Sequence, residues 1–253
     1  TLKNLSDSNV TIKFFPEGGH LINDLEGKVA IYISKGDQTN SGIEMTGLVF
    51  DQDDNEVAKF NTSEQGYSFF LLTPEREKSY VARIVSDSSV LSFHLPKAKD
   101  SGINMRVAQT SSGDFEVNLN KSPDFGKKVY AVIHTRGVIK QIESIDLTTK
   151  NKIKILANSL TPGISHITIM DYSFNPLLER LIFKYPENHK SLELNYNNSY
   201  LTRQKVKVAL SPDVLRVSEQ ISKLSISVSQ TNGVSSDNII SNLLLTSDIR
   251  GKV

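Results

Sequence analysis

The chain has 253 residues, of which 38% are hydrophobic, enough for packed cores in two or three domains of about 100 residues each. Its 29 Lys and Arg residues against 28 Asp and Glu residues leave a formal net charge of +1, without the clustered basic surplus of a nucleic-acid-binding protein, so we expect no nucleic-acid partner. The absence of cysteine excludes a disulfide framework and a cysteine-based zinc site.

Apolar runs and the first residues of the chain bear on membrane insertion and export. No apolar run approaches the ~20 residues that cross a bilayer as a helix, so we predict no transmembrane segment in this piece. The N-terminus, Thr1-Leu2-Lys3-Asn4, lacks an initiator Met and a signal-peptide pattern. We therefore expect a processed or excised piece of a longer protein, whose other domains are its first partners.

The first predicted domain, residues 1–99, is a β-sandwich. Short β-branched or aromatic runs alternate with turn residues and show no long helical period, which favours strands. Pro16, Gly18 and Gly19 predict a sharp turn after the first strand, because proline withholds a backbone donor and glycine tolerates positive φ. The predicted strands are residues 10–15, 28–34, 45–51, 56–61, 66–72, 79–86 and 90–95.

The turn between residues 45–51 and 56–61 has the best metal-binding composition in the chain. Its Asp51, Asp53 and Asn55 stand at alternate positions, as in a calcium loop. The sixth position, however, holds glutamate where such a loop needs glycine, and the twelfth holds threonine where it needs a bidentate glutamate. We interpret the segment as a solvated hairpin turn and predict no metal site.

The polar stretch 96–102 predicts a linker into a second domain, residues 100–187, which also has the pattern of a sandwich. In its middle, lysines at 150, 152 and 154 alternate with isoleucines, which indicates a strand with one solvated face rather than a basic binding stripe. The predicted strands are residues 104–109, 114–120, 128–134, 152–157, 164–171 and 179–185.

The last two of these strands form a predicted β-hairpin at residues 163–185. Ile167 and Ile169 fall on one face of the first strand. Turn-forming residues follow at 171–176, and a second alternation predicts an apolar face on the return strand. That face comprises Leu181, Phe183 and Tyr185.

The third predicted domain, residues 188–253, is a β-sandwich that is too short to be complete. Apolar residues alternate with polar ones in three runs, as in strands with one wet face. Cap-forming residues at 235–237 and apolar residues at near-helical spacing predict a short helix near 237–247. The alternating apolar sets are Leu192, Leu194 and Tyr196; Val206, Val208 and Leu210; and Leu224, Ile226 and Val228.

Three stretches resemble a known family. The hairpin reads Gly-Ile-x-x-Ile-Thr-Ile-x-Asp, then Asn-Pro-Leu-x-Glu-Arg-Leu-Ile-Phe, and looks like the closing strands of a macroglobulin domain, the β-sandwich of the α2-macroglobulin and complement group. Residues 14–21, Phe-Phe-Pro-Glu-Gly-Gly-His-Leu, are similar to the opening of such a domain in bacterial members, and residues 200–206 resemble the start of another. Pattern and resemblance together predict an all-β fold of tandem immunoglobulin-like or macroglobulin-like antiparallel β-sandwiches with one short C-terminal helix.

The order of these motifs, followed by residues 237–248, more narrowly resembles large envelope proteins of Gram-negative bacteria. In that group macroglobulin-like domains precede a plug-like domain of the kind found in TonB-dependent receptors. The resemblance implies an extracytoplasmic location, in the periplasm or at the outer-membrane surface, beside TonB-dependent nutrient uptake. Protease-trapping members of the family use a thioester that needs cysteine, which this chain lacks, so that chemistry cannot reside here.

The sequence nominates no catalytic group and no cofactor site. It contains no Gly-x-Ser-x-Gly elbow, phosphate loop or dinucleotide fingerprint, and its five histidines are scattered without metal-ligand spacing. We interpret Glu179 and Arg180 as a structural pair. Aromatic residues near the hairpin tip and the second linker are candidate partner contacts, with packing at domain junctions as the alternative. They are Tyr172, Phe174, Tyr196 and Tyr200.

Three functions remain open. We favour a non-enzymatic scaffold or binding fragment of a larger cell-envelope protein, which docks through edge strands and end loops to an outer-membrane transporter or to a surface glycan or peptide. A carbohydrate-binding accessory module or hydrolase domain would need a concave pocket with convergent carboxylates. A protease-inhibiting macroglobulin without the thioester would need a bait loop.

Overall fold

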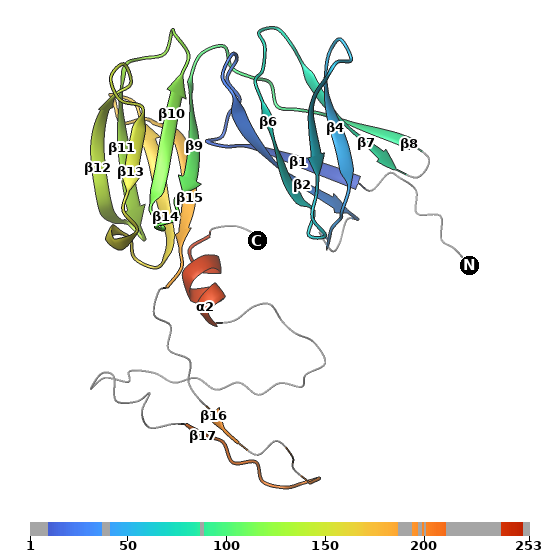
Figure 1. The fold of residues 1–253 in the computed structure, drawn as a ribbon, viewed down its shortest axis with the longest axis vertical. Coiled ribbons are helices and arrows are strands. Elements are labelled where there is room, and N and C mark those ends of the chain that lie inside the picture. Colours follow the sequence, from blue (N-terminus) through green and yellow to red (C-terminus); the bar gives the residue numbers. More distant parts are fainter. Residues whose placement is uncertain are drawn as a thin grey trace. The chain divides into compact units, whose positions relative to one another are not determined.

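The computed structural model describes residues 10–36, 41–86, 89–186, 194–196, 199, 201–210 and 239–249. The chain divides into two compact units, residues 1–184 and 185–253. The described part of the first unit consists of antiparallel sheets that form two immunoglobulin-like β-sandwiches in tandem (Figure 1), which confirms the predicted fold class. The predicted domain boundaries, between residues 99 and 100 and between 187 and 188, stay predictions.

The first sandwich has two sheets with four strands each. In one sheet β2 (Gly27–Lys35) lies between β1 (Val10–Pro16) and a side shared by β6 (Tyr67–Leu72) and the two-residue β3 (Ser41–Gly42). The other sheet has the order β5-β4-β7-β8. Its strands are β4 (Thr46–Asp51), β5 (Glu56–Asn61), β7 (Tyr80–Ser86) and β8 (Ser89–His94).

The alternation of β2 sets both the core and the outer face of the first sandwich. Val29, Ile31 and Ile33 are fully buried in the core, as the two-residue period of a strand predicts. The residues between them point to the opposite face of the sheet, where Lys28 and Ala30 are part of the surface described below.

The second sandwich pairs the three-stranded sheet β13-β10-β9 with the four-stranded sheet β12-β11-β14-β15. If the short β3 is set aside, both sandwiches have the same connectivity: the first, second and fifth strands form one sheet, and the others form the second. The strands are β9 (Ile103–Gln109), β10 (Phe115–Lys121), β11 (Lys128–Thr135), β12 (Val138–Asp146), β13 (Lys152–Ile155), β14 (Gly163–Met170) and β15 (Pro176–Lys184).

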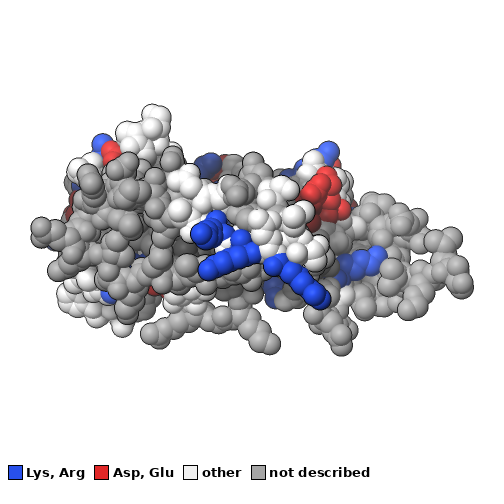
Figure 2. All heavy atoms as spheres, turned by 90° about the horizontal axis from the view of Figure 1, so that it is seen from below, with Lys and Arg blue, Asp and Glu red and all other residues white. Residues whose placement is uncertain are grey.

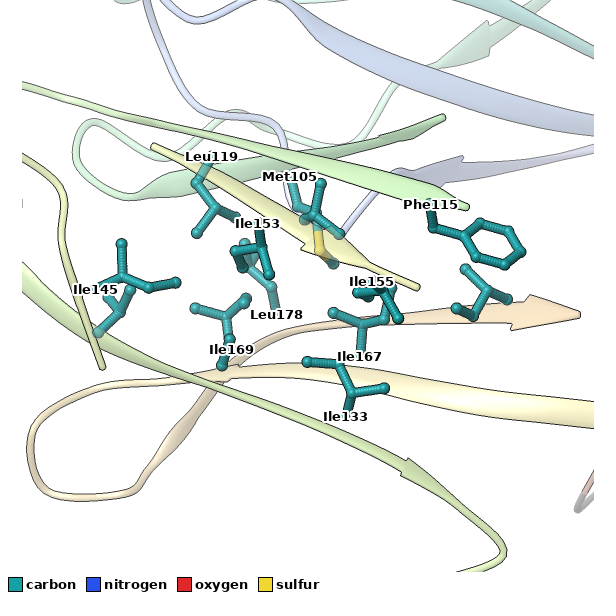
Figure 3. Close-up of a cluster of buried hydrophobic side chains, with 14 of the residues drawn as sticks. Met105, Phe115, Leu119, Ile133, Ile145, Ile153, Ile155, Ile167, Ile169 and Leu178 are labelled. Atoms are coloured by element: carbon teal, nitrogen blue, oxygen red, sulfur yellow. The ribbon is translucent and has the colours of Figure 1, made fainter. Parts of the chain in front are cut away.

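Isoleucine dominates the core of the second sandwich. Side chains from β13 and β10, such as Ile153 and Leu119, face side chains from the other sheet across the interior (Figure 3). Ile167 and Ile169 of β14 are 0% exposed, which confirms the predicted inward face of the hairpin.

Two strands of this sandwich differ from the prediction. The sequence analysis missed β12, because only its Ile145 is buried, while Val138, Ile139 and Ile142 are 57–60% exposed. On β15 the predicted apolar face is wrong. Leu178 and Ile182 lie in the core, directly opposite the buried Ile169 and Ser165 of β14, whereas Leu181, assigned to the apolar face, is exposed.

The described residues of the second unit form short elements. β16 (Leu194–Asn195) pairs with β17 (Ala209–Leu210), and α2 (Ile239–Ser241) continues into the π-helical η3 (Asn242–Thr246), inside the predicted helix. The strand predicted around Val206 and Val208 is wrong except at its end, since both valines precede β17 and are exposed. The strand predicted around Ile226 lies outside the described residues. No helix in the described ranges is long and apolar enough to cross a bilayer.

Candidate binding surface

Two of the four aromatic candidates lie at the tip of the β14–β15 hairpin. Tyr172 and Phe174 are 78% and 65% exposed there. Tyr196 is also exposed, in the second unit, and Tyr200 lies outside the described residues. The structure therefore brings Tyr172 and Phe174 together on one turn.

This turn is organised by Asp171. Its carboxylate accepts hydrogen bonds from the backbone N–H groups of Ser173 and Asn175 at 2.8 and 2.9 Å. The side-chain and backbone hydrogen bonds from Asn175 lower the pKa of Asp171. Phe174 has φ 64°, a left-handed conformation that is strained for a bulky residue, and its ring stacks on Tyr130 with centroids 5.0 Å apart. The turn thus holds an aromatic ring on the outer face of the sheet.

The suspected calcium loop of the first sandwich is the same kind of turn. The Asp51 carboxylate accepts hydrogen bonds from the backbone N–H groups of Asp53 and Asn55, both at 2.9 Å, and also pairs with Lys78 at 3.1 Å. Hydrogen bonds from Asn55 are the main reason that the pKa of Asp51 is lowered to about 2. Asp51 is occupied by the turn itself, and the predicted hairpin is confirmed by the β4–β5 pairing.

Two of the scattered histidines meet on the outer face of the second sandwich. His134 of β11 lies directly opposite His166 of β14, and their rings stack with centroids 4.7 Å apart. The Nδ1 atom of His166 lies 2.6 Å from a carboxylate oxygen of Glu179, whereas Nδ1 of His134 is buried without a partner. Burial, followed by the charge of His166, lowers the pKa of His134.

Glu179 and Arg180, which the sequence indicated to be structural rather than catalytic, contact different partners. Glu179 binds His166 on its own sheet, while Nε of Arg180 lies 3.2 Å from Oε1 of Glu17 in the first sandwich. The Glu17 side chain is only 6% exposed, and the backbone N–H of Val107 donates a hydrogen bond of 3.4 Å to the same oxygen. Arg180 therefore ties the two sandwiches together.

Further polar contacts join the same two sandwiches. The side chain of Asn104 donates a hydrogen bond of 2.7 Å to the backbone carbonyl of Glu26, and Arg106 forms an ion pair with the Glu26 carboxylate at 3.0 Å. The linker is also bound, because the side chain of Asn23 donates to Asp100 at 2.8 Å. The predicted linker is thus bonded at Lys99 and Asp100 to a loop of the first sandwich.

A cavity of about 450 Å³ lies where the two sandwiches meet, and we call it the junction cleft. Phe15 and Phe69 contribute its aromatic walls and are 52% and 55% exposed. The ammonium of Lys28 lies 4.0 Å from the centre of the Phe69 ring, at the distance of a cation–π contact. The complete lining is Phe15, Pro16, Glu17, Gly18, Gly19, Lys28, Ala30, Ser68, Phe69, Glu179, Arg180 and Leu181.

A second hollow, of about 660 Å³, lies over β4, β5 and β7 of the first sandwich. Its Arg83 is occupied, because it forms an ion pair with Asp54 and lies over the Phe50 ring. Among the described residues, those that line this hollow have no buried side-chain polar atom without a hydrogen-bond partner. Glu17 of the junction cleft does have such an atom. The junction cleft is therefore the stronger candidate site.

Charges of both signs are present on the protein surface. On the face shown in Figure 2, described Lys and Arg side chains gather near the middle of the view, and acidic side chains lie apart from them. This mixture fits the formal net charge of +1.

No protein-family model matches the chain, and no curated protein does. Among solved structures, the BSP domain of a biofilm-associated protein is 13% identical, with a TM-score of 0.30, over 71% of this chain and 30% of that one. A two-domain fibronectin type III segment of chicken tenascin is 10% identical, with a TM-score of 0.27, over 68% and 99% of the two chains. A C-terminal 282-residue fragment of intimin is 9% identical, with a TM-score of 0.24, over 70% and 63%. At these values the similarities say nothing of what this chain binds.

Proposed function

We propose that this chain is a non-enzymatic binding arm of a larger extracytoplasmic protein, with the junction cleft as its docking surface. The observation that carries the proposal is that both sandwiches contribute walls to one cleft. Direct bonds between the sandwiches, above all Arg180 with Glu17, hold these walls together. A tied pair of sandwiches is a stiff spacer that presents one fixed surface.

The two best-matching macroglobulin-like motifs meet at this cleft. Glu17 belongs to the motif at residues 14–21 and Arg180 to the motif at 163–185, and their side chains form the ion pair across the junction. This pairing supports the proposal that the arm belongs to a macroglobulin-like envelope protein of a Gram-negative bacterium. In that setting it would act in the periplasm or at the outer-membrane surface, beside TonB-dependent uptake.

The proposal includes the absence of catalysis, although two carboxylates line the cleft. Both carboxylates are engaged within the chain: Glu17 forms an ion pair with Arg180, and an oxygen of Glu179 lies 2.6 Å from Nδ1 of His166. We expect the purified chain to release no reducing ends from polygalacturonate, alginate or laminarin above the buffer background. Release that disappears in Glu179→Gln would contradict the proposal and support a hydrolase.

Fractionation of the source cells tests the cellular part of the proposal. An antibody against residues 1–253 should detect a band much larger than 28.1 kDa in the envelope fraction. A soluble band near 28.1 kDa would contradict the binding arm of a larger envelope protein.

A further inference from the structure

The floor and walls of the junction cleft form an open aromatic trough. Ala30 on β2 lies directly opposite Phe15 on β1 and directly opposite Phe69 on β6. Neighbouring strands are about 4.8 Å apart, so the two phenylalanines stand roughly 10 Å apart across an exposed alanine. A trough of this width, with aromatic sides and a methyl floor, suits a flat ring with apolar faces.

The cleft also contains a hydrogen-bond acceptor without a donor. Oε1 of Glu17 forms an ion pair with Arg180 and accepts a hydrogen bond from the backbone N–H of Val107, but Oε2 is buried and has no hydrogen-bond partner within the described structure. A buried carboxylate oxygen without a donor is costly, so a donor from outside the chain is favoured. Because Glu17 lines the cleft, a ligand hydroxyl bound there can supply it.

One lysine lines the trough, and a second lies beside it. Lys28 lies in the cleft, and Lys13 is exposed one position further along the same face of β1 as Phe15. In the described part of the structure neither lysine forms an ion pair with a carboxylate, whereas Glu17 and Glu179 are both paired. The trough therefore offers cations to an acidic ligand.

We propose that the junction cleft binds an acidic polysaccharide, a chain of pyranose sugars with uronate carboxylates. One sugar ring lies between Phe15 and Phe69, its hydroxyl donates to Glu17, and a carboxylate pairs with Lys28. A cavity of about 450 Å³ is within the usual range of about 300–1,000 Å³ for small-ligand sites. The inference rests on the proposed function, because it names the ligand of that same cleft.

Electrophoresis of the 253-residue chain in native gels containing polysaccharide tests this inference. Polygalacturonate or alginate should retard the chain, and the neutral glucan laminarin should not. Phe69→Ala and Lys28→Ala should each weaken the binding about tenfold, a typical loss for one aromatic or cation contact. Both side chains lie on the outer face of the sheet, so thermal unfolding should show an intact fold for each variant.

Matched control variants distinguish binding in the junction cleft from non-specific binding of the polysaccharide elsewhere on the protein surface. Tyr172→Ala removes an even more exposed aromatic ring outside the cleft, and Lys152→Ala removes an exposed lysine on β13; both should bind like the unaltered chain. No retardation by either acidic polysaccharide, or equal losses in all four variants, would overturn the inference. If the acidic polysaccharides fail while the antigen is large and envelope-bound, the ligand class is wrong and the proposed function stands.

Discussion

At the residue scale, one aspartate organises each of two hairpin turns. Asp51 and Asp171 each accept from the backbone N–H groups two and four residues later, with an asparagine at the fourth position. The residue before that asparagine, Asp54 or Phe174, has positive φ in both turns. The composition that suggests a calcium loop is therefore explained by the backbone that the aspartate binds.

Replacing Asp51 by asparagine tests the role of its charge. The pKa of Asp51 is lowered from an ordinary value of 3.8 to about 2, so its charge stabilises the fold above about pH 4, and that stabilisation is lost as the pH falls toward 2. Asp51→Asn should lower the thermal unfolding midpoint at pH 7, and the gap to the unaltered chain should close between pH 5 and pH 2. A gap that does not change with pH would contradict the assignment.

The pKa of His134 is also lowered, so protonation of this group destabilises the fold at a higher pH than protonation of Asp51 does. The His134 pKa is lowered from 6.5, mainly by burial and then by His166, so the folded state resists its protonation. Stability should therefore be complete above about pH 6.5 and fall as the pH drops below it. Thermal unfolding from pH 7.5 to pH 5 should show a shallower fall in His134→Gln than in the unaltered chain. The exposed His94 provides the control, since His94→Gln should leave the slope as it is.

At the element scale, β12 and β14 show which kinds of strand can be predicted from the sequence. β14 alternates strictly, with Ile167 and Ile169 inside, and its strand and inner face could be predicted. In β12 the apolar residues Val138, Ile139, Ile142 and Ile145 do not alternate with polar ones, and only the last is buried, so no period of two was visible. An edge strand needs few inward residues, which weakens its signal.

The contrast between these two strands can be measured. Ile167→Ala should lower the unfolding free energy by about 3 kcal/mol, because it leaves a cavity in a closed core. Ile142→Ala, on the exposed face of β12, should change it by less than about 0.5 kcal/mol. Urea denaturation of both variants gives the comparison. Similar losses would mean that β12 does not face solvent as described.

Long-range pairing is the part of the site that the sequence could not predict. His134 and His166 both occupy outward positions of predicted strands, but no local sequence pattern predicts that β11 pairs with β14. The partner of Arg180 is equally hidden. Alternation along β15 places Glu179 and Arg180 on opposite faces, but nothing in the sequence shows that Arg180 reaches Glu17 of the first sandwich. The turns and the strand order within hairpins are local, and these were predictable.

At the scale of the whole molecule, the junction makes two sandwiches act as one body. One contact across the junction is the ion pair of Arg180 with Glu17, whose side chain is only 6% exposed. Loss of the arginine would leave a buried carboxylate without its cation. Stability and ligand binding therefore depend on the same contact.

Arg180→Met tests this tie. It should lower the unfolding free energy by about 2 kcal/mol, below the usual cost of breaking a fully buried pair because Arg180 itself is half exposed. Arg83→Met breaks a comparable pair with the well-exposed Asp54 and should cost less than about 1 kcal/mol. Urea denaturation compares the two variants, and equal costs would show that Glu17 is not buried at the junction.

The most direct measurement of the central claim is a methyl NMR titration of the 253-residue chain with oligogalacturonate. We predict that the methyl signals of Ala30, from the first sandwich, and of Leu181, from the second, change their chemical shifts together, because both residues line the junction cleft. Ile142, on the exposed face of β12, should not shift. Shifts at Ile142 without shifts at Ala30 and Leu181, or no shifts at all, would contradict the claim that the cleft between the sandwiches is the binding site.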